Sequence, residues 1–148
     1  MTRQSWTLVA LVVALGALYL FRFTDLGRVR QIQINVSSRP FAPRAAPDDP
    51  LPVIFGLDQE WPLTALRVLP LSEVSNTHPK SVWNLSSPKG SQPTRGFAYG
   101  DDLPGMQLLG GVPPVKLVPG TAYRLQVEAG RARGTADFTP QAAGGGAQ

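Results

Sequence analysis

The most pronounced feature of the hydrophobic pattern is an uninterrupted apolar run near the start of the chain. Residues 6–21, WTLVALVVALGALYLF, carry no charge. As a helix that rises about 1.5 Å per residue they span roughly 24 Å, so flanking residues must complete a hydrocarbon core about 30 Å thick. Aromatic side chains flank the run at both ends, which is typical of the two interfaces of a bilayer. We predict one transmembrane helix near 6–23, within an N-terminal anchor over 1–28.

A cleaved signal peptide is the alternative interpretation of this run. Ala14-Leu15-Gly16 offers small residues at positions suited to a signal peptidase. The hydrophobic run continues past that point through Phe21, whereas a signal peptide usually stops being hydrophobic near its cleavage site. We therefore favour a signal anchor that remains as a single-pass membrane helix.

Small side chains gather on one side of the predicted helix. Ala10, Ala14 and Ala17 follow the helical spacing and fall on one stripe, and we place Gly16 beside them. Such a face lets another membrane helix approach closely, because helix packing in lipid depends on small residues. The alternative is that alanine is simply common in membrane spans. We treat these four residues as a candidate helix-docking face.

Beyond the helix the pattern changes to the two-residue period of β-strands. Residues 31–36 alternate polar and apolar side chains strictly, which predicts a membrane-proximal strand. Five prolines then fall within 38–52, so we assign 29–52 to this strand and a Pro-rich linker.

Short apolar runs with turn signals between them fill most of the remaining chain. We predict strands over 53–57, 64–69, 81–86, 94–99, 123–128 and 134–139, the last two forming a hairpin. This spacing is typical of an all-β fold, and we expect a small seven-strand sandwich over 53–140, in which the pattern locates six strands. Residues 141–148 are rich in glycine and have nothing to bury, so we expect a disordered tail.

One segment near the carboxyl end carries a recognisable motif. Residues 117–129, LVPGTAYRLQVEA, contain a leucine, a Pro-Gly-Thr turn and a tyrosine that opens an alternating strand, namely Leu117, Pro119, Gly120 and Tyr123. This segment resembles the E to F corner and F strand of fibronectin type III domains, which belong to the immunoglobulin-like β-sandwiches, and the resemblance continues through the G strand to Phe138. The resemblance implies a tyrosine corner, with the ring in the core and the hydroxyl bonded to the backbone upstream. It also implies a scaffold or binding unit, tethered here by one N-terminal transmembrane helix.

The side of the membrane on which the sandwich lies is contested by the charges around the helix. Arg3 precedes the apolar run 6–21, while Arg22, Arg28 and Arg30 follow it, and positive charges favour the cytoplasmic side. A short N-terminal stub is, however, common in signal anchors, and the sandwich resembles an extracytoplasmic type of domain. We expect the sandwich to be extracytoplasmic, on the periplasmic side.

Composition removes several classes of function. Cysteine is absent and histidine occurs once, which excludes thiolate chemistry and most catalytic constellations. The net charge is +4, but lysine and arginine are dispersed, so nucleic-acid binding is not expected. No phosphate-binding loop or metal-ligand spacing occurs. We expect no enzyme activity, no cofactor and no metal.

Residues 96–106 have the most unusual local composition. They combine two aromatic side chains with an acidic pair and a methionine, namely Phe97, Tyr99, Asp101, Asp102 and Met106. Aromatic residues and methionine are enriched at interface cores, which makes this segment a candidate contact loop. The alternative is a strand with Phe97 or Tyr99 pointing inward, followed by an ordinary turn.

Two functions remain. The first is a non-catalytic accessory or structural subunit of a larger membrane complex, which binds other membrane protein subunits through its helix and sandwich. The second is a membrane-tethered recognition module for a glycan or peptide ligand. That module needs exposed aromatic platforms, for which only Trp61 and Trp83 are available, and we expect Trp83 in the core. We favour the accessory subunit.

Overall fold

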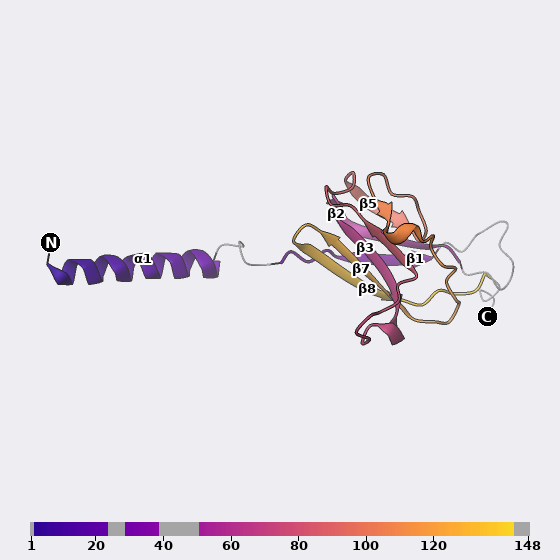
Figure 1. Ribbon diagram of the computed structural model, residues 1–148, viewed down its shortest axis with the longest axis horizontal. Helices are drawn as coiled ribbons and strands as arrows, with labels where there is room; N and C mark the ends of the chain where they lie inside the picture. Colours follow the sequence, from indigo (N-terminus) through magenta and orange to yellow (C-terminus); the bar gives the residue numbers. More distant parts are fainter. Residues whose placement is uncertain (1, 24–28, 39–50, 144–148) are drawn as a thin grey trace.

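The computed structural model describes residues 2–23, 29–38 and 51–143, which form an apolar helix and a β domain (Figure 1). The helix α1 (Arg3–Phe23) contains 21 residues, and none of them is buried. It is long and apolar enough to cross a membrane. It begins three residues before the predicted start, where the Ser5 N–H donates to the carbonyl of Thr2 in the first turn. The predicted apolar helix is therefore confirmed.

The β domain consists of two antiparallel sheets. Its strands are β1 (Ile34–Ser38), β2 (Val53–Trp61), β3 (Ala65–Pro70), β4 (Trp83–Ser86), β5 (Thr94–Ala98), β6 (Gln107–Leu108), β7 (Tyr123–Ala129) and β8 (Ala132–Phe138), with short 3-10 turns at Leu71–Glu73 and Leu109–Gly111. The smaller sheet has the order β1-β2-β5, and the larger has the order β6-β4-β3-β7-β8. The two sheets share one hydrophobic core, so the predicted predominance of β structure is confirmed.

The strand nearest to α1 belongs to this domain. β1 pairs with β2 over its whole length, from Ile34 opposite Leu57 to Ser38 opposite Val53. The sequence pattern assigns this strand to a separate membrane-proximal segment, 29–52, because the prolines that follow it interrupt the pattern. Hydrogen bonds between strands far apart in sequence override that local signal. The two-sheet fold thus begins well before residue 53.

β2 is longer than its apolar pattern suggests. The strand alternates buried and less buried residues up to Leu57, continues through three exposed residues, and ends at the buried Trp61. Its register against β5 shifts between Gly56 and Trp61, so the strand contains an irregularity there. The indole Nε1 of Trp61 donates to the carboxylate of Asp58 at 2.8 Å, which satisfies the polar atom of this buried ring.

The core is built around aromatic side chains from both sheets. Phe55 is fully buried and lies against Phe97 and Phe138, with ring centroids 5.4 and 5.1 Å away. Trp83 is 2% exposed and meets Phe97 at 6.1 Å. The expected core position of Trp83 is confirmed. These contacts join β2 and β5 of one sheet to β4 and β8 of the other.

Two predicted segments fall largely outside the described residues. Most of the Pro-rich linker, 39–50, and the end of the glycine-rich tail, 144–148, belong to them. The described start of the tail takes part in the fold, because the Leu51 N–H donates to the carbonyl of Gln141 at 2.8 Å.

Candidate functional site

The corner that precedes β7 places a tyrosine hydroxyl against the backbone. Tyr123 is 3% exposed, and its ring stacks on Phe138, its partner in the register of β7 and β8, at 5.8 Å. The Val118 N–H donates to the Tyr123 hydroxyl oxygen at 3.0 Å. This bond returns to the backbone five residues upstream, and Leu117 beside it is buried. The corner is thus held by one aromatic ring and one backbone donor.

The turn in this corner has a specific backbone requirement. The Thr121 N–H donates to the Val118 carbonyl across Pro119 and Gly120, and Gly120 has φ +81°. Proline at the second position and a glycine with positive φ at the third are typical of a type II turn. The Gly120 N–H also donates to the carbonyl of Pro140, which fastens the corner to the end of the domain.

The aromatic residues of the candidate contact loop point into the domain. Phe97 is a buried residue of β5, and Tyr99 lies edge-on to Trp83 with ring centroids 5.1 Å apart. The Tyr99 hydroxyl donates to the carbonyl of Val115 at 2.6 Å. Burial raises the pKa of Tyr99 well above its ordinary value, and the nearby Tyr123 adds to this effect.

The rest of that segment forms a turn and a core contact. The Asp101 carboxylate accepts the Ala98 N–H at 2.8 Å, and Gly100 between them has φ +83°. Met106 is buried, whereas Asp102 is exposed. The alternative interpretation of 96–106, an inward aromatic strand followed by a turn, therefore describes the segment. The contact-loop interpretation is wrong for Phe97 and Met106, because the core covers them.

The small residues of α1 do not all share one face. Successive helical residues are rotated by about 100°, so Ala10, Ala14 and Ala17 lie within about 60° of one another. Gly16 lies about 100° or more around the helix from each of them. No atom beyond its chain neighbours and the helix backbone lies within 4 Å of a Cβ built at Gly16. The candidate docking face consequently consists of the three alanines, and our placement of Gly16 beside them is wrong.

A second feature of interest lies where the chain enters the β domain. The Ile32 N–H donates to the Arg133 carbonyl at 2.8 Å, and the Arg133 N–H donates to the Arg30 carbonyl at 2.9 Å. These bonds add the entering segment to the outer edge of β8 as a parallel bridge. Because β1 follows at once, the entering chain touches one sheet and then joins the other.

Only a glycine on β8 allows this approach. A Cβ at Gly134 would meet the carbonyl oxygen of Ile32 at 2.5 Å and its Cβ at 2.9 Å. Gly134 is not among the residues predicted from the sequence. A glycine inside a predicted strand was the available signal, since it often marks the close approach of another backbone.

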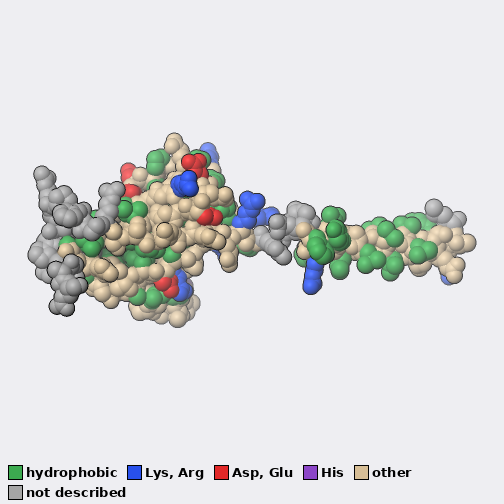
Figure 2. Space-filling model, turned by 180° about the vertical axis from the view of Figure 1, so that it is seen from behind, with side chains coloured by type: hydrophobic (Ala, Val, Ile, Leu, Met, Phe, Trp, Pro, Cys, Tyr) green, Lys and Arg blue, Asp and Glu red, His purple; other side chains and the backbone are tan. Residues whose placement is uncertain are grey.

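A hollow opens beside this contact. Its volume is about 290 Å³, and its lining includes the polar residues Gln31, Gln33, Arg133 and Thr135. Arg133 lies 3.7 Å from Glu128 and is exposed, as are the neighbouring Arg30 and Arg131. Lysine and arginine side chains are visible at the end of the domain that adjoins the helix (Figure 2).

One ion pair elsewhere on the domain joins β7 to β8. Across β7 and β8, Arg124 donates to both carboxylate oxygens of Asp137 at 2.7 and 3.0 Å. These hydrogen bonds lower the pKa of Asp137 and raise the pKa of Arg124. Within the described residues, no three histidine, cysteine, aspartate or glutamate side chains gather as a metal site requires.

Comparisons with models of protein families, with curated proteins and with solved structures found no match to this chain.

Proposed function

We propose that this chain is a single-pass membrane protein that serves as a non-catalytic accessory subunit of a larger membrane complex. The observation that carries the proposal is the state of α1, none of whose residues is buried against the β domain. A helix of this kind needs lipid or another helix around it. The stripe of Ala10, Ala14 and Ala17 lies between Trp6 and Phe21 on the same face, which leaves a recess between two large side chains.

The β domain supplies a second contact surface. From the last residue of β6 to the corner before β7, the chain exposes a series of large apolar side chains, each more than a third accessible, namely Leu108, Leu109, Val112, Val115 and Val118. Exposed apolar residues that follow one another along a segment are typical of surfaces that bind other proteins. We assign this strip, together with the alanine face, to the interface with other membrane subunits.

The same burial pattern disfavours the glycan-binding alternative. Trp61 is 8% exposed and Trp83 is 2% exposed, so both candidate platforms lie in the core. Our expectation that Trp61 is available as an exposed platform is wrong, because the end of β2 folds it inward. The recognition-module hypothesis is therefore limited to a peptide ligand, which would bind the apolar strip.

For the fold, we infer a fibronectin type III-like sandwich. The hydrogen bond from Val118 to Tyr123 supports a tyrosine corner. The strand order adds to this, because β4 pairs with β3, whereas the fourth strand of an immunoglobulin constant-type sandwich joins the sheet of the first strand. A domain of this class is a scaffold, which is consistent with a structural subunit.

Affinity purification of the full chain from its native membranes in mild detergent tests the proposal. We expect other membrane proteins to co-migrate, and Ala14→Leu to reduce their recovery because it fills the recess. Val12→Leu is the matched control, since position 12 lies on the opposite side of the helix. A chain that migrates alone and retains a soluble peptide or glycan would replace the accessory subunit with the recognition module.

A further inference from the structure

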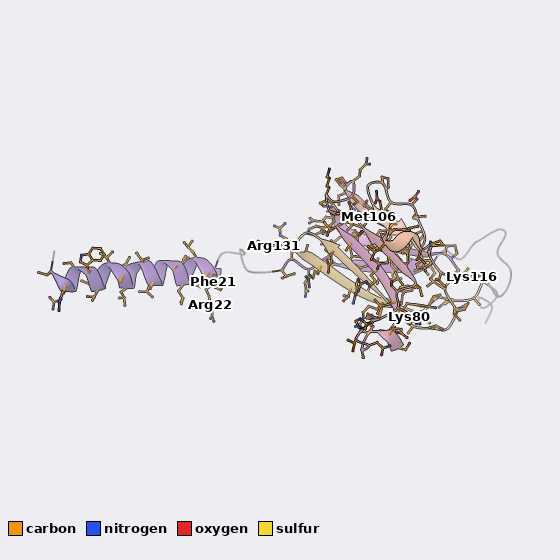
Figure 3. The ribbon with its side chains drawn as sticks, viewed as in Figure 1. Phe21, Arg22, Lys80, Met106, Lys116 and Arg131 are labelled. Carbon is orange, nitrogen blue, oxygen red and sulfur yellow. The ribbon has the colours of Figure 1, made fainter. Side chains whose placement is uncertain are left out.

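The end of the β domain nearest to α1 carries a cluster of arginines on a rigid backbone. Arg131 lies in the two-residue turn between β7 and β8, where Gly130 has φ +62°. Arg133 follows on β8, and its backbone N–H is bonded to the carbonyl of Arg30. Figure 3 shows Arg131 at the end of the domain that points toward α1. We call Arg30, Arg131 and Arg133 the basic tip.

The covalent chain keeps this tip close to the end of the membrane helix. Only residues 24–28 separate the last residue of α1, Phe23, from the first described residue of the β domain, Val29. Six residue steps of at most about 3.6 Å span no more than about 22 Å. From Arg30 onward the chain is fixed to β8 by two hydrogen bonds, so no further slack lies between the helix and the tip.

The charge of the tip is positive. Glu128 is the acidic partner of one of its three arginines, at 3.7 Å from Arg133, so three positive charges face one negative charge. The register of β2 against β1 and β5 brings Asp58, Glu60 and Arg95 to the same end, and Lys89 lies beside them in the loop that contacts Pro62 at Gly90. The two acidic residues offset the two basic ones. The arginines of the tip therefore leave this end with a net positive charge.

We propose that the basic tip binds the anionic lipid surface next to α1, with lipid phosphates paired to Arg30, Arg131 and Arg133. This inference rests on the proposal that α1 spans a membrane. Arginine suits the role because its planar guanidinium donates two parallel hydrogen bonds to a phosphate. Beside the arginines lies the hollow lined by Arg133, Gln31, Gln33 and Thr135. Its polar side chains can hydrogen-bond to a lipid headgroup that the arginines attract by charge.

The lipid contact has a structural consequence for the domain. Electrostatic attraction to a membrane surface decays within a Debye length of about 10 Å, so the tip must touch the headgroups to gain from it. In that position the turn between β7 and β8 contacts the membrane surface, and the corner at Tyr123 lies at the opposite end of the same strands, away from the membrane. The apolar strip that follows β6 is then left free for a protein partner.

The full chain, reconstituted in vesicles, provides the test. It contains no cysteine, so one introduced cysteine carries a fluorophore at a single position. Gln59→Cys labels the end of β2 near the tip, because the adjacent Asp58 N–H donates to Gln33. Thr77→Cys labels the opposite end, in the loop that follows β3. A quencher attached to the lipid headgroup reports which label approaches the membrane.

We expect the label at position 59 to be quenched more in vesicles that contain phosphatidylglycerol than in neutral phosphatidylcholine vesicles, and high salt to remove the difference. The label at position 77 should not respond to lipid charge. Each arginine lost from the tip should lower the contact equilibrium about fivefold. The triple variant Arg30→Gln, Arg131→Gln, Arg133→Gln should therefore show no dependence on lipid charge.

A matched control removes the same charge elsewhere. The variant Arg67→Gln, Lys80→Gln, Arg124→Gln also loses three positive charges, one of them from an ion pair, and should behave as the original chain. Quenching at position 59 that ignores lipid charge, or that depends on it equally in the tip variant, would overturn the lipid contact. Flotation with neutral vesicles at high salt separates the two proposals. A chain that does not float refutes the membrane span and this contact together, whereas a floating chain without charge-dependent quenching refutes the contact alone.

Discussion

The carbonyl oxygen of Ile32 occupies the space in which a side chain on Gly134 would begin. A Cβ at position 134 would meet that oxygen at 2.5 Å. The contact brings the chain that leaves α1 onto the edge of β8, and among the described glycines Gly134 alone would place a Cβ within 3.0 Å of another residue. The path of the chain from the helix into the domain thus depends on the absence of a side chain at position 134.

Gly134→Ala should separate the entering segment from β8. Overpacking in a closely packed site costs about 1 to 3 kcal/mol, so we expect a loss of this size in the free energy of unfolding. The amide hydrogens of Ile32 and Arg133, which bond across this contact, should exchange faster with solvent. Gly56→Ala is the control, because its Cβ would meet only ordinary contacts at 3.8 Å and beyond. Equal exchange rates in the original chain and Gly134→Ala would contradict the role of this contact.

Tyr123→Phe should destabilise the β domain by about 1 to 3 kcal/mol, because the Val118 N–H loses its acceptor while the ring remains in the core. Denaturant unfolding followed by the fluorescence of the buried Trp61 and Trp83 measures this loss. Tyr19→Phe removes a hydroxyl from α1 and should leave the unfolding midpoint of the domain unchanged. A midpoint unaffected by Tyr123→Phe would remove the tyrosine corner and the main support for the fibronectin type III-like assignment.

Local patterns were sufficient to predict most strands. Residues 123–128 alternate along all but the last residue of β7, and the helix was evident from the lack of charge in 6–21. The hydrophobic pattern did not predict strands correctly where contacts between distant segments determine which residues join a sheet. β1 looked separate because prolines follow it, but hydrogen bonds to β2 make it part of a sheet. β6 has only two residues, too few for any period, and its pairing with β4 defines it.

The candidate site residues divide in the same way. A motif whose geometry is local, such as the Pro119-Gly120 turn, could be predicted because backbone preferences within four residues define it. Whether Trp61 or Met106 is exposed depends on which strands cross above it, and composition alone cannot supply that. The basic tip could not be predicted from the sequence, because Arg30 and Arg133 lie about a hundred residues apart and meet only through the pairing at the edge of β8.

The adjacent residues Asp101 and Asp102 should differ in their effect on stability. Asp101→Ala removes the acceptor of the Ala98 N–H, so we expect a loss of about 0.5 to 1.5 kcal/mol in the free energy of unfolding. Asp102 has an exposed side chain, and Asp102→Ala should change little. Denaturant unfolding of both variants measures the difference. Equal effects would show that the acidic pair acts through its charge rather than through the turn.

Stability at alkaline pH should depend on Tyr99. Burial raises its pKa above the ordinary value of 10.0, so the folded domain keeps a proton that the unfolded chain releases. The stabilisation is complete below pH 10 and is lost as the pH rises from there toward the raised pKa. We expect the free energy of unfolding to fall less steeply above pH 10 in Tyr99→Phe than in the original chain. The same slope in both proteins would show that Tyr99 titrates normally.

We expect the β domain to lie on the extracytoplasmic side of the membrane. Positive charges that flank a span favour the cytoplasm, and Arg22, Arg28 and Arg30 follow the apolar run 6–21 whereas Arg3 precedes it. The basic tip gives Arg30 a second role as a lipid ligand held to β8, so its charge need not report topology. We expect a reporter fused after Gln148 to be active if it functions only outside the cytoplasm. A reporter that requires the cytoplasm should be inactive at the same position. The opposite pair of results would place the domain in the cytoplasm and show that the flanking arginines determine orientation.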